Sequence, residues 1–140
     1  STVKHAHHHF DIDRKGKDSY EHRRAGASEV MISSVNRWAL MHELREGNDP
    51  PLSELMEHMS PVDLLIVEGF KWETHPKIEI HRPSLGKPLL QPEDTNIIAV
   101  ASDESLHGLA VPVLPLGDIY GIAEFVVNAV SLEAPEGSEL

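Results

Sequence analysis

The 140-residue sequence contains no cysteine, few aromatic residues and about half as many basic as acidic residues. Without cysteine the chain can form neither a disulfide nor a thiolate metal site, which fits a reducing compartment. Its 12 Lys and Arg against 23 Asp and Glu give a net charge of −11. That charge argues against nucleic acid or an anionic membrane as the main partner. No apolar run approaches the roughly 20 residues of a membrane span, and no signal-peptide pattern occurs. We therefore expect a cytoplasmic protein.

Short apolar and periodic segments predict strands that alternate with helices. Strands are expected at 2–4, 29–35, 37–43, 63–67, 77–82, 96–101 and 111–114, and helices at 19–25, 52–59 and 119–130. Asp18 and Asp118 are predicted N-caps, the first with Glu21 as a capping-box partner. The alternation is typical of an α/β fold with a mostly parallel sheet. One domain is expected over residues 1–131, and an acidic disordered tail over 132–140.

The most informative segment is the apolar run 64–67, which Glu68 and Gly69 follow directly. Such a run is typical of a buried parallel strand, and ligands in α/β sheets bind outside the carboxyl ends of strands. Glu68 would lie at that edge, where Gly69 would allow a close approach of backbone or ligand. A strand that simply ends at a solvated glutamate is the alternative.

Polar residues also follow two other predicted strands, namely His5 after residues 2–4 and Ser102-Asp103 after residues 96–101. If the three strands are parallel neighbours, these side chains and Glu68 share one edge of the sheet. That edge is the expected place for a phosphate, nucleotide or metal site.

The stretch from residue 5 to residue 13 is dense in metal-ligand side chains. In an extended conformation, residues two apart share a face, which groups His5, His7, His9, Asp11 and Asp13. Imidazole and carboxylate together suit Zn²⁺ or another transition ion, whereas the two carboxylates alone would suit Mg²⁺. The remnant of a purification tag and a mobile polar loop that binds nothing are the alternatives.

The segment 15–19 has the composition of an anion-contacting loop. Gly16 permits a tight turn, Lys17 supplies positive charge, and Ser19 starts a predicted helix whose free N–H groups attract anions. A solvated charged turn is the alternative. The segment is not a G-x-x-x-x-G-K-[ST] phosphate loop, and no such loop occurs in the sequence.

Taken together, these segments resemble the molybdopterin-guanine dinucleotide biosynthesis protein B (MobB) family. The resemblance rests on Val3–His8 with Asp11 and Asp13, Gly16–Tyr20, Arg23, Ala25–Ala27, Arg37–Met41, Leu65–Lys71, Lys77-Ile78 and Ile98–Asp103. It covers nearly the whole chain apart from the acidic tail.

The resemblance implies a P-loop NTPase-like three-layer fold, a homodimer and an accessory role beside the molybdenum cofactor guanylyltransferase. It also implies binding of GTP with Mg²⁺ and weak GTPase activity in the intact protein. Glu68 is then the catalytic and metal-side residue of a Walker B element. The other implied nucleotide contacts are Gly69, Asp103, Lys17 and Ser19, and the other implied metal ligands are Asp11 and Asp13. A switch-like loop that faces the nucleotide and the partner would contain His5, His7, His8 and Asp18.

One feature of the family is absent from this sequence. The family's first strand, phosphate loop and helix would precede Ser1, so we expect a fold truncated before its second strand. We also expect this polypeptide by itself to bind GTP poorly and to be inactive. Two other functions stay open at this point, a metal-dependent hydrolytic or metal-binding domain built on the His/Asp stretch and a non-catalytic adaptor.

Overall fold

The computed structural model describes residues 1–6, 10–45, 47 and 49–131. By its internal contacts the chain divides into a first unit, Ser1–Phe70, and a second unit that begins at Lys71. The elements in chain order are β1 (Thr2–Lys4), α1 (Asp18–Arg24), β2 (Glu29–Ser33), β3 (Trp38–His42), α2 (Leu52–Glu57), β4 (Ile66–Glu68), β5 (Lys77–His81), β6 (Ile97–Ser102), β7 (Val113–Pro115) and α3 (Ile119–Ala129), with short 3₁₀ turns at Pro83–Leu85 and Gln91–Glu93.

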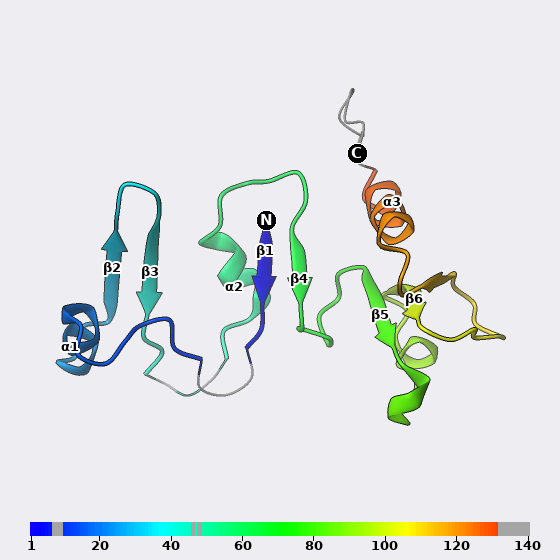
Figure 1. Cartoon of the computed structure of the whole chain (residues 1–140), viewed down its shortest axis with the longest axis horizontal. Coiled ribbons are helices and arrows are strands. Elements are labelled where there is room, and N and C mark those ends of the chain that lie inside the picture. The colour runs from blue at the N-terminus through cyan, green and yellow to red at the C-terminus, as the bar shows by residue number, and fades with distance from the viewer. Residues whose placement is uncertain (7–9, 46, 48, 132–140) are drawn as a thin grey trace. The chain divides into compact units, whose positions relative to one another are not determined.

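Two short parallel strands, β1 and β4, bring the start of the chain beside the Glu68 segment (Figure 1). Their register pairs Lys4 with Glu68. Parallel pairing requires a long crossover, and here α1, the β2–β3 hairpin and α2 lie between the two strands in sequence. The positions directly after β1 and β4 therefore lie next to each other.

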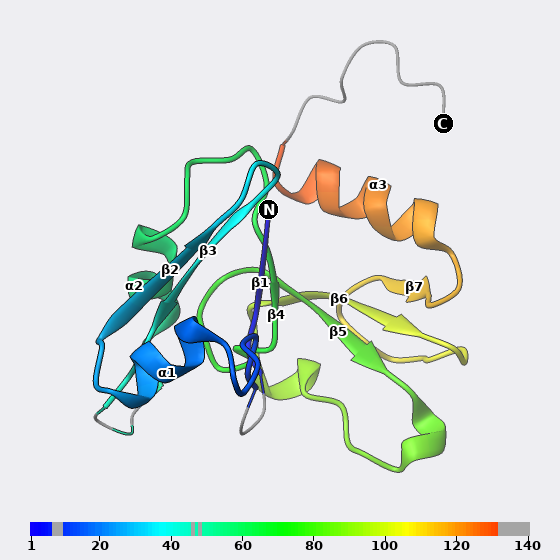
Figure 2. The ribbon, with the colours of Figure 1, turned by 60° about the vertical axis from the view of Figure 1, so that its left-hand side comes forward.

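The β2 and β3 strands form an antiparallel hairpin that packs against α1 (Figure 2). Val30 and Met41 are register partners and are both buried, so they supply the core of this part of the unit. The turn is closed by Ser34, whose backbone N–H and side-chain hydroxyl both donate to the carbonyl of Arg37. The hairpin agrees with the two strands expected at 29–35 and 37–43.

The second unit contains a parallel sheet in the order β5-β6-β7. The central strand β6 is the most buried element, and Ala99, Val100 and Ala101 are fully inaccessible. This confirms the buried strand expected at 96–101. The helix α3 contacts β7, and its N-cap is Asp118, whose Oδ1 accepts a hydrogen bond of 2.9 Å from the backbone N–H of Gly121. The predicted N-cap at Asp118 is therefore confirmed.

The pairing of the strands confirms the α/β class with mostly parallel sheets, because among the strands of the described residues only the β2–β3 pair is antiparallel. Among the helices in the described part of the chain, none has the length and apolarity needed to span a lipid bilayer. The division into one domain and an acidic tail stays a prediction, since residues 132–140 lie outside the described residues.

Three local expectations were wrong. The strand expected at 63–67 is shorter and starts at Ile66. It is not buried, since Ile66 is 54% exposed and β1 is the single strand that pairs with β4 in the described part of the chain. The capping box at Asp18 does not form, because α1 starts one residue earlier, with Lys17 at the N-cap and no side-chain cap bond. The second helix ends at Glu57 rather than at Met59.

Candidate functional site

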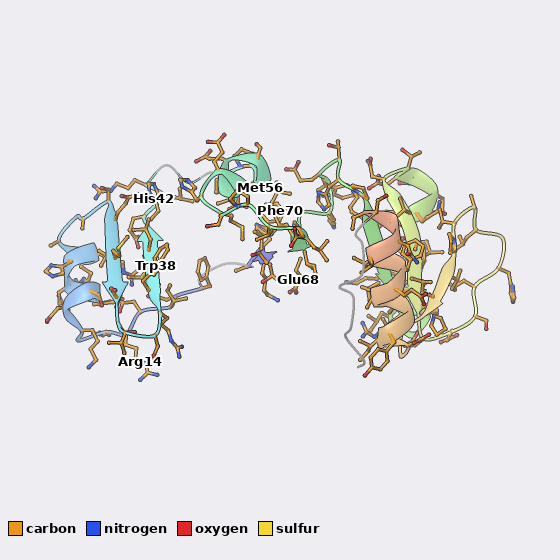
Figure 3. The ribbon with its side chains drawn as sticks, turned by 90° about the horizontal axis from the view of Figure 1, so that it is seen from above. Arg14, Trp38, His42, Met56, Glu68 and Phe70 are labelled. Atoms are coloured by element: carbon orange, nitrogen blue, oxygen red, sulfur yellow. The ribbon has the colours of Figure 1, made fainter. Side chains whose placement is uncertain are left out.

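Glu68 lies at the carboxyl end of β4 and pairs with Lys4 across the two parallel strands. The Lys4 Nζ is 2.5 Å from the Glu68 Oε1, and both side chains are about two thirds exposed. Exposed pairs of this kind contribute little to stability. Lys4 therefore orients Glu68 without withdrawing its carboxylate from solvent, and Figure 3 shows Glu68 beside the labelled Phe70.

Gly69 allows the chain to pass directly over His5. Its φ is +88°, and a Cβ built there would lie 2.8 Å from the Cβ of His5. The backbone N–H of His5 donates to the carbonyl of Glu68 at 2.8 Å. A side chain at position 69 would therefore force this contact apart. The close approach expected at Gly69 is found, and the approaching group is the chain's own His5.

His5 is held by two further contacts. Its ring lies 5.0 Å, centroid to centroid, from the ring of Phe70, at an interplanar angle of 51°. Phe70 itself has a positive φ of 49°, a conformation that is costly for a bulky residue. The Nε2 of His5 is 3.3 Å from the Oδ2 of Asp49, in the loop before α2. The residues at and directly after the ends of β1 and β4 thus form one contact cluster. We call it the Gly69 junction (His5, Glu68, Gly69 and Phe70).

A second cluster is centred on the guanidinium of Arg23 in α1. Its Nη2 bonds both carboxylate oxygens of Asp11 at 3.0 Å, its Nε lies 3.3 Å from the Oδ2 of Asp13, and its Nη1 donates to the Oε1 of Glu43 at 2.8 Å. The planar donor fork of arginine suits such multidentate binding. This arginine cluster (Arg23, Asp11, Asp13 and Glu43) joins the segment before α1 to α1 and to the residue that follows β3.

The cluster has three carboxylates and a single positive charge. Neutral hydrogen-bond donors stabilise the aspartates in addition to Arg23. The Oδ1 of Asp13 accepts from the Ser19 hydroxyl at 2.9 Å and from the Arg14 N–H at 2.8 Å. The Asp13 N–H in turn donates to the Oδ1 of Asp11. The Asp13 side chain is only 4% exposed, so these partners are needed to offset its desolvation.

Hydrogen bonding lowers the pKa of both aspartates. Burial opposes ionisation of Asp13, but the bonds from Arg14, Ser19 and Arg23 outweigh it and hold the pKa below the ordinary 3.8. The Asp13 N–H and then the Arg23 guanidinium likewise hold the pKa of Asp11 below that value. Glu43 and Asp11 raise the pKa of Arg23 above its ordinary range. Asp11, Asp13 and Arg23 are therefore ionised at neutral pH.

The other predicted site residues are distributed over the two units. Lys17 is the N-cap residue of α1, Asp18 is the first residue of that helix, and the hydroxyl of Ser19 is given to Asp13. Asp103 lies at the end of β6, where its Oδ2 is 4.0 Å from the Nε of Arg82. His7, His8 and His9 lie outside the described residues. Within the described residues, no group of three or more His, Cys, Asp or Glu side chains is arranged to hold a metal ion.

The expected meeting of three strand ends depended on the strands being neighbours. β1 and β4 are neighbours, so His5 and Glu68 are adjacent. β6 pairs with β5 and β7 instead, in the second unit. Ser102 and Asp103 therefore do not follow a strand that is paired with β1 or β4.

The sequence analysis did not predict that Arg23 would bind several carboxylates or that Glu43 would be one of them. One signal was present, because Ser19 and Arg23 are four residues apart and so share one face of a helix. The pairing of Asp11 with Asp13 on one face was expected from their spacing. Their common ligand in the structure is Arg23.

Comparison with known proteins identifies the family. Residues 1–103 match the family model described as molybdopterin guanine dinucleotide synthesis protein B, MobB. This chain belongs to that family. A molybdopterin-guanine dinucleotide biosynthesis adapter protein from Escherichia coli is 44% identical over 129 residues, which cover 90% of this chain and 73% of the relative. A protein of the same description from Haemophilus influenzae is 37% identical over 129 residues, covering 91% and 71%.

Two solved structures of the family share the fold. A crystal structure of molybdopterin-guanine biosynthesis protein B superposes with a TM-score of 0.63 at 26% identity, covering 91% of this chain and 78% of that one. A MobB homolog from Bacillus stearothermophilus gives 0.62 at 27% identity, covering 93% and 76%. The P-loop NTPase-like α/β fold expected from the sequence is confirmed by these likenesses to MobB structures.

Replacing Gly69 tests the close approach to His5. We expect Gly69→Ala to be destabilising, because alanine must adopt a positive φ and its Cβ must displace His5. Gly108→Ala is the matched control, since Gly108 has a φ of +78° but no atom near its added Cβ. Urea titration measures the free energy of unfolding of both variants. Gly108→Ala should lower it by about 1 kcal/mol, and Gly69→Ala should lower it distinctly more. Equal losses would show that the contact with His5 imposes no constraint.

The arginine cluster predicts a pH dependence. The lowered pKa values of Asp11 and Asp13 contribute stability that is present above their ordinary value of 3.8 and lost as pH falls through the folded values. Arg23→Gln should therefore be destabilising at neutral pH, and its deficit relative to the wild type should shrink below about pH 4. Thermal melts across this range measure the deficit. Arg24→Gln, an exposed neighbour on α1, should show little deficit at any pH.

Proposed function

We propose that this chain acts as an adaptor in the biosynthesis of molybdopterin guanine dinucleotide. The observation that carries the proposal is family membership over residues 1–103, together with two relatives described as adapter proteins of this biosynthesis. The partner in this proposal is the molybdenum cofactor guanylyltransferase, and both would act in the cytoplasm. The Gly69 junction supports a role in binding a partner, because its Glu68 carboxylate is exposed to solvent and held by Lys4.

The nucleotide in this proposal is GTP with Mg²⁺, hydrolysed weakly by the intact protein. Mg²⁺ is usually held by one or two carboxylates, several waters and the phosphates of the nucleotide. Glu68 fits that requirement, since its carboxylate is exposed at the end of a parallel strand and its single bonded cation is Lys4 among the described residues. Gly69, Asp103, Lys17 and Ser19 are the proposed nucleotide contacts.

Binding of Mg²⁺ or Zn²⁺ to the His/Asp stretch is less well supported. The oxygens of Asp11 and Asp13 are already bonded to Arg23, Ser19 and backbone N–H groups. An ion at these carboxylates would have to displace the guanidinium. A metal-dependent hydrolytic function is therefore not favoured by the described residues.

Reconstitution tests the adaptor role. Formation of molybdopterin guanine dinucleotide from molybdopterin and GTP by the guanylyltransferase should be faster when the intact protein is added. Glu68→Gln should lower GTP turnover and its Mg²⁺ dependence, because the amide is a weaker metal ligand than the carboxylate. Glu57→Gln, at the exposed end of α2, is the matched control. If the intact protein neither binds the guanylyltransferase nor changes its rate, the adaptor proposal fails.

A homodimer is also proposed, on the support of one apolar face of the hairpin. The register places Met31, Trp38 and Leu40 on the same face, where they are 62%, 67% and 43% exposed. An exposed apolar patch of this kind is typical of an interaction surface. Figure 3 labels Trp38 on the hairpin.

Sedimentation equilibrium tests the dimer. The double variant Trp38→Ser/Leu40→Ser should be monomeric at concentrations where the wild type is dimeric, because apolar area buried between copies would be lost. The control Trp72→Ser/Leu85→Ser removes similarly exposed side chains, 75% and 63% exposed, from the second unit. A wild type that is monomeric at every accessible concentration would refute the dimer.

A further inference from the structure

A groove of about 590 Å³ runs beside β2 in the first unit. It is open to solvent, and it is formed by the segments 12–14 and 17–19, by His22 on α1 and by residues 30–33 of β2. All of these residues belong to the α1–hairpin part of the unit, where α1 packs on β2. Arg14, which lines the groove, is labelled in Figure 3.

The apolar side of the groove is a strand edge. Four successive residues of β2, from Val30 to Ser33, line the groove. Successive side chains of a strand point to opposite faces, so a groove lined by all four runs along the strand's edge. In the described part of the chain, β3 is the single strand that pairs with β2. Four residues at ~3.3 Å each give an edge of roughly 13 Å.

The polar side of the groove is positively charged. Arg14 and Lys17 line it, and among the described residues neither side chain takes part in an ion pair or a hydrogen bond. Two carboxylates also line it, those of Asp13 and Asp18. Asp13 is 4% exposed and bonded to Arg23, Ser19 and a backbone N–H. Because Asp13 is paired within the arginine cluster, its carboxylate does not neutralise Arg14 or Lys17, and these two cations can bind an acidic ligand.

This positive surface is unusual in a chain of net charge −11. Five of the 12 basic residues fall between positions 14 and 24, against two acidic residues there, Asp18 and Glu21. They are Arg14, Lys15, Lys17, Arg23 and Arg24, of which Arg23 is paired with the three carboxylates of the arginine cluster. A local positive patch on an acidic protein attracts an acidic partner and repels other copies of the chain.

We propose that this groove binds an extended, acidic segment of a partner protein. The partner's backbone would pair with the edge of β2, as in β-strand addition, and its carboxylates would face Arg14 and Lys17. The groove includes Lys17 and Ser19, which are also proposed nucleotide contacts. Among the described residues, however, the imidazole of His22 is the single aromatic ring that lines it, and the groove is open rather than enclosing, so it suits an extended segment better than a base. The inference rests on the adaptor role proposed above, since an adaptor needs a surface that recognises a partner.

Direct binding tests the groove without the guanylyltransferase. The probe is a fluorescein-labelled peptide of four Glu-Val repeats, titrated with the full 140-residue chain at low salt and followed by anisotropy. Binding should weaken by at least about tenfold in Arg14→Glu/Lys17→Glu, and it should weaken with added salt. The same peptide with Gln in place of Glu should bind much more weakly.

The control variant Arg37→Glu/Lys87→Glu makes the same change of net charge at two exposed positions that do not line the groove. It should keep at least half of the wild-type affinity. Circular dichroism melts confirm that both double variants are folded. Amide chemical-shift changes on peptide addition should concentrate on residues 30–33.

Three results would overturn the inference. They are absence of peptide binding, equal loss in the control variant, and peptide binding that leaves the amides of residues 30–33 unchanged. GTP–Mg²⁺ binding that depends on Arg14 and Lys17 while the peptide does not bind would assign the groove to the nucleotide instead. Reconstitution that succeeds while the peptide fails would preserve the adaptor role and reject only this surface.

Discussion

The guanidinium of Arg23 is the interaction on which the order of the α1–hairpin region depends. It binds Asp11 from the segment before α1 and Glu43 from the residue after β3, while its own helix supplies Ser19 to Asp13. Three carboxylates placed this closely would repel one another without the arginine, and Asp13 would be buried without a cation. One side chain therefore fixes the path of the chain before α1 relative to the hairpin.

A different constraint orders the Gly69 junction. There the contact is backbone packing, because Gly69 passes over the Cβ of His5 with no room for a side chain. The β1–β4 pair is only three residues long on each strand, too short to be stable by strand pairing alone. Three contacts continue the pairing past the ends of the two strands. They are the approach of Gly69 to His5, the hydrogen bond from the His5 N–H to Glu68 and the packing of His5 on Phe70. The exposed carboxylate of Glu68 is thus presented from an ordered backbone.

Much of the fold could be predicted from the sequence because local patterns decide it. The apolar run 97–101 of β6, the Asp118 cap and the two short hairpin strands each carry their own signal, and the structure contains all three. The burial of β4 could not be predicted in this way, since burial depends on what covers a strand, and an apolar run describes only the strand. The arginine cluster was missed for a similar reason. Asp11, Asp13, Arg23 and Glu43 span 33 positions of sequence, and their meeting is decided by how α1 packs on the hairpin.

The hairpin offers an apolar face and a charged groove that share Met31, and this arrangement matters for a protein proposed to act as an adaptor. Its buried face, with Val30 and Met41, belongs to the core of the α1–hairpin region. Its opposite face carries the exposed Trp38 and Leu40, and one edge of β2 lines the charged groove. Apolar burial is not directional, so the apolar face suits association of identical copies, whereas charge discriminates between partners. Asp13 is paired with Arg23, so its carboxylate does not neutralise Arg14 or Lys17 in the groove. The ion pairs that hold the α1–hairpin region together therefore also keep the groove positively charged.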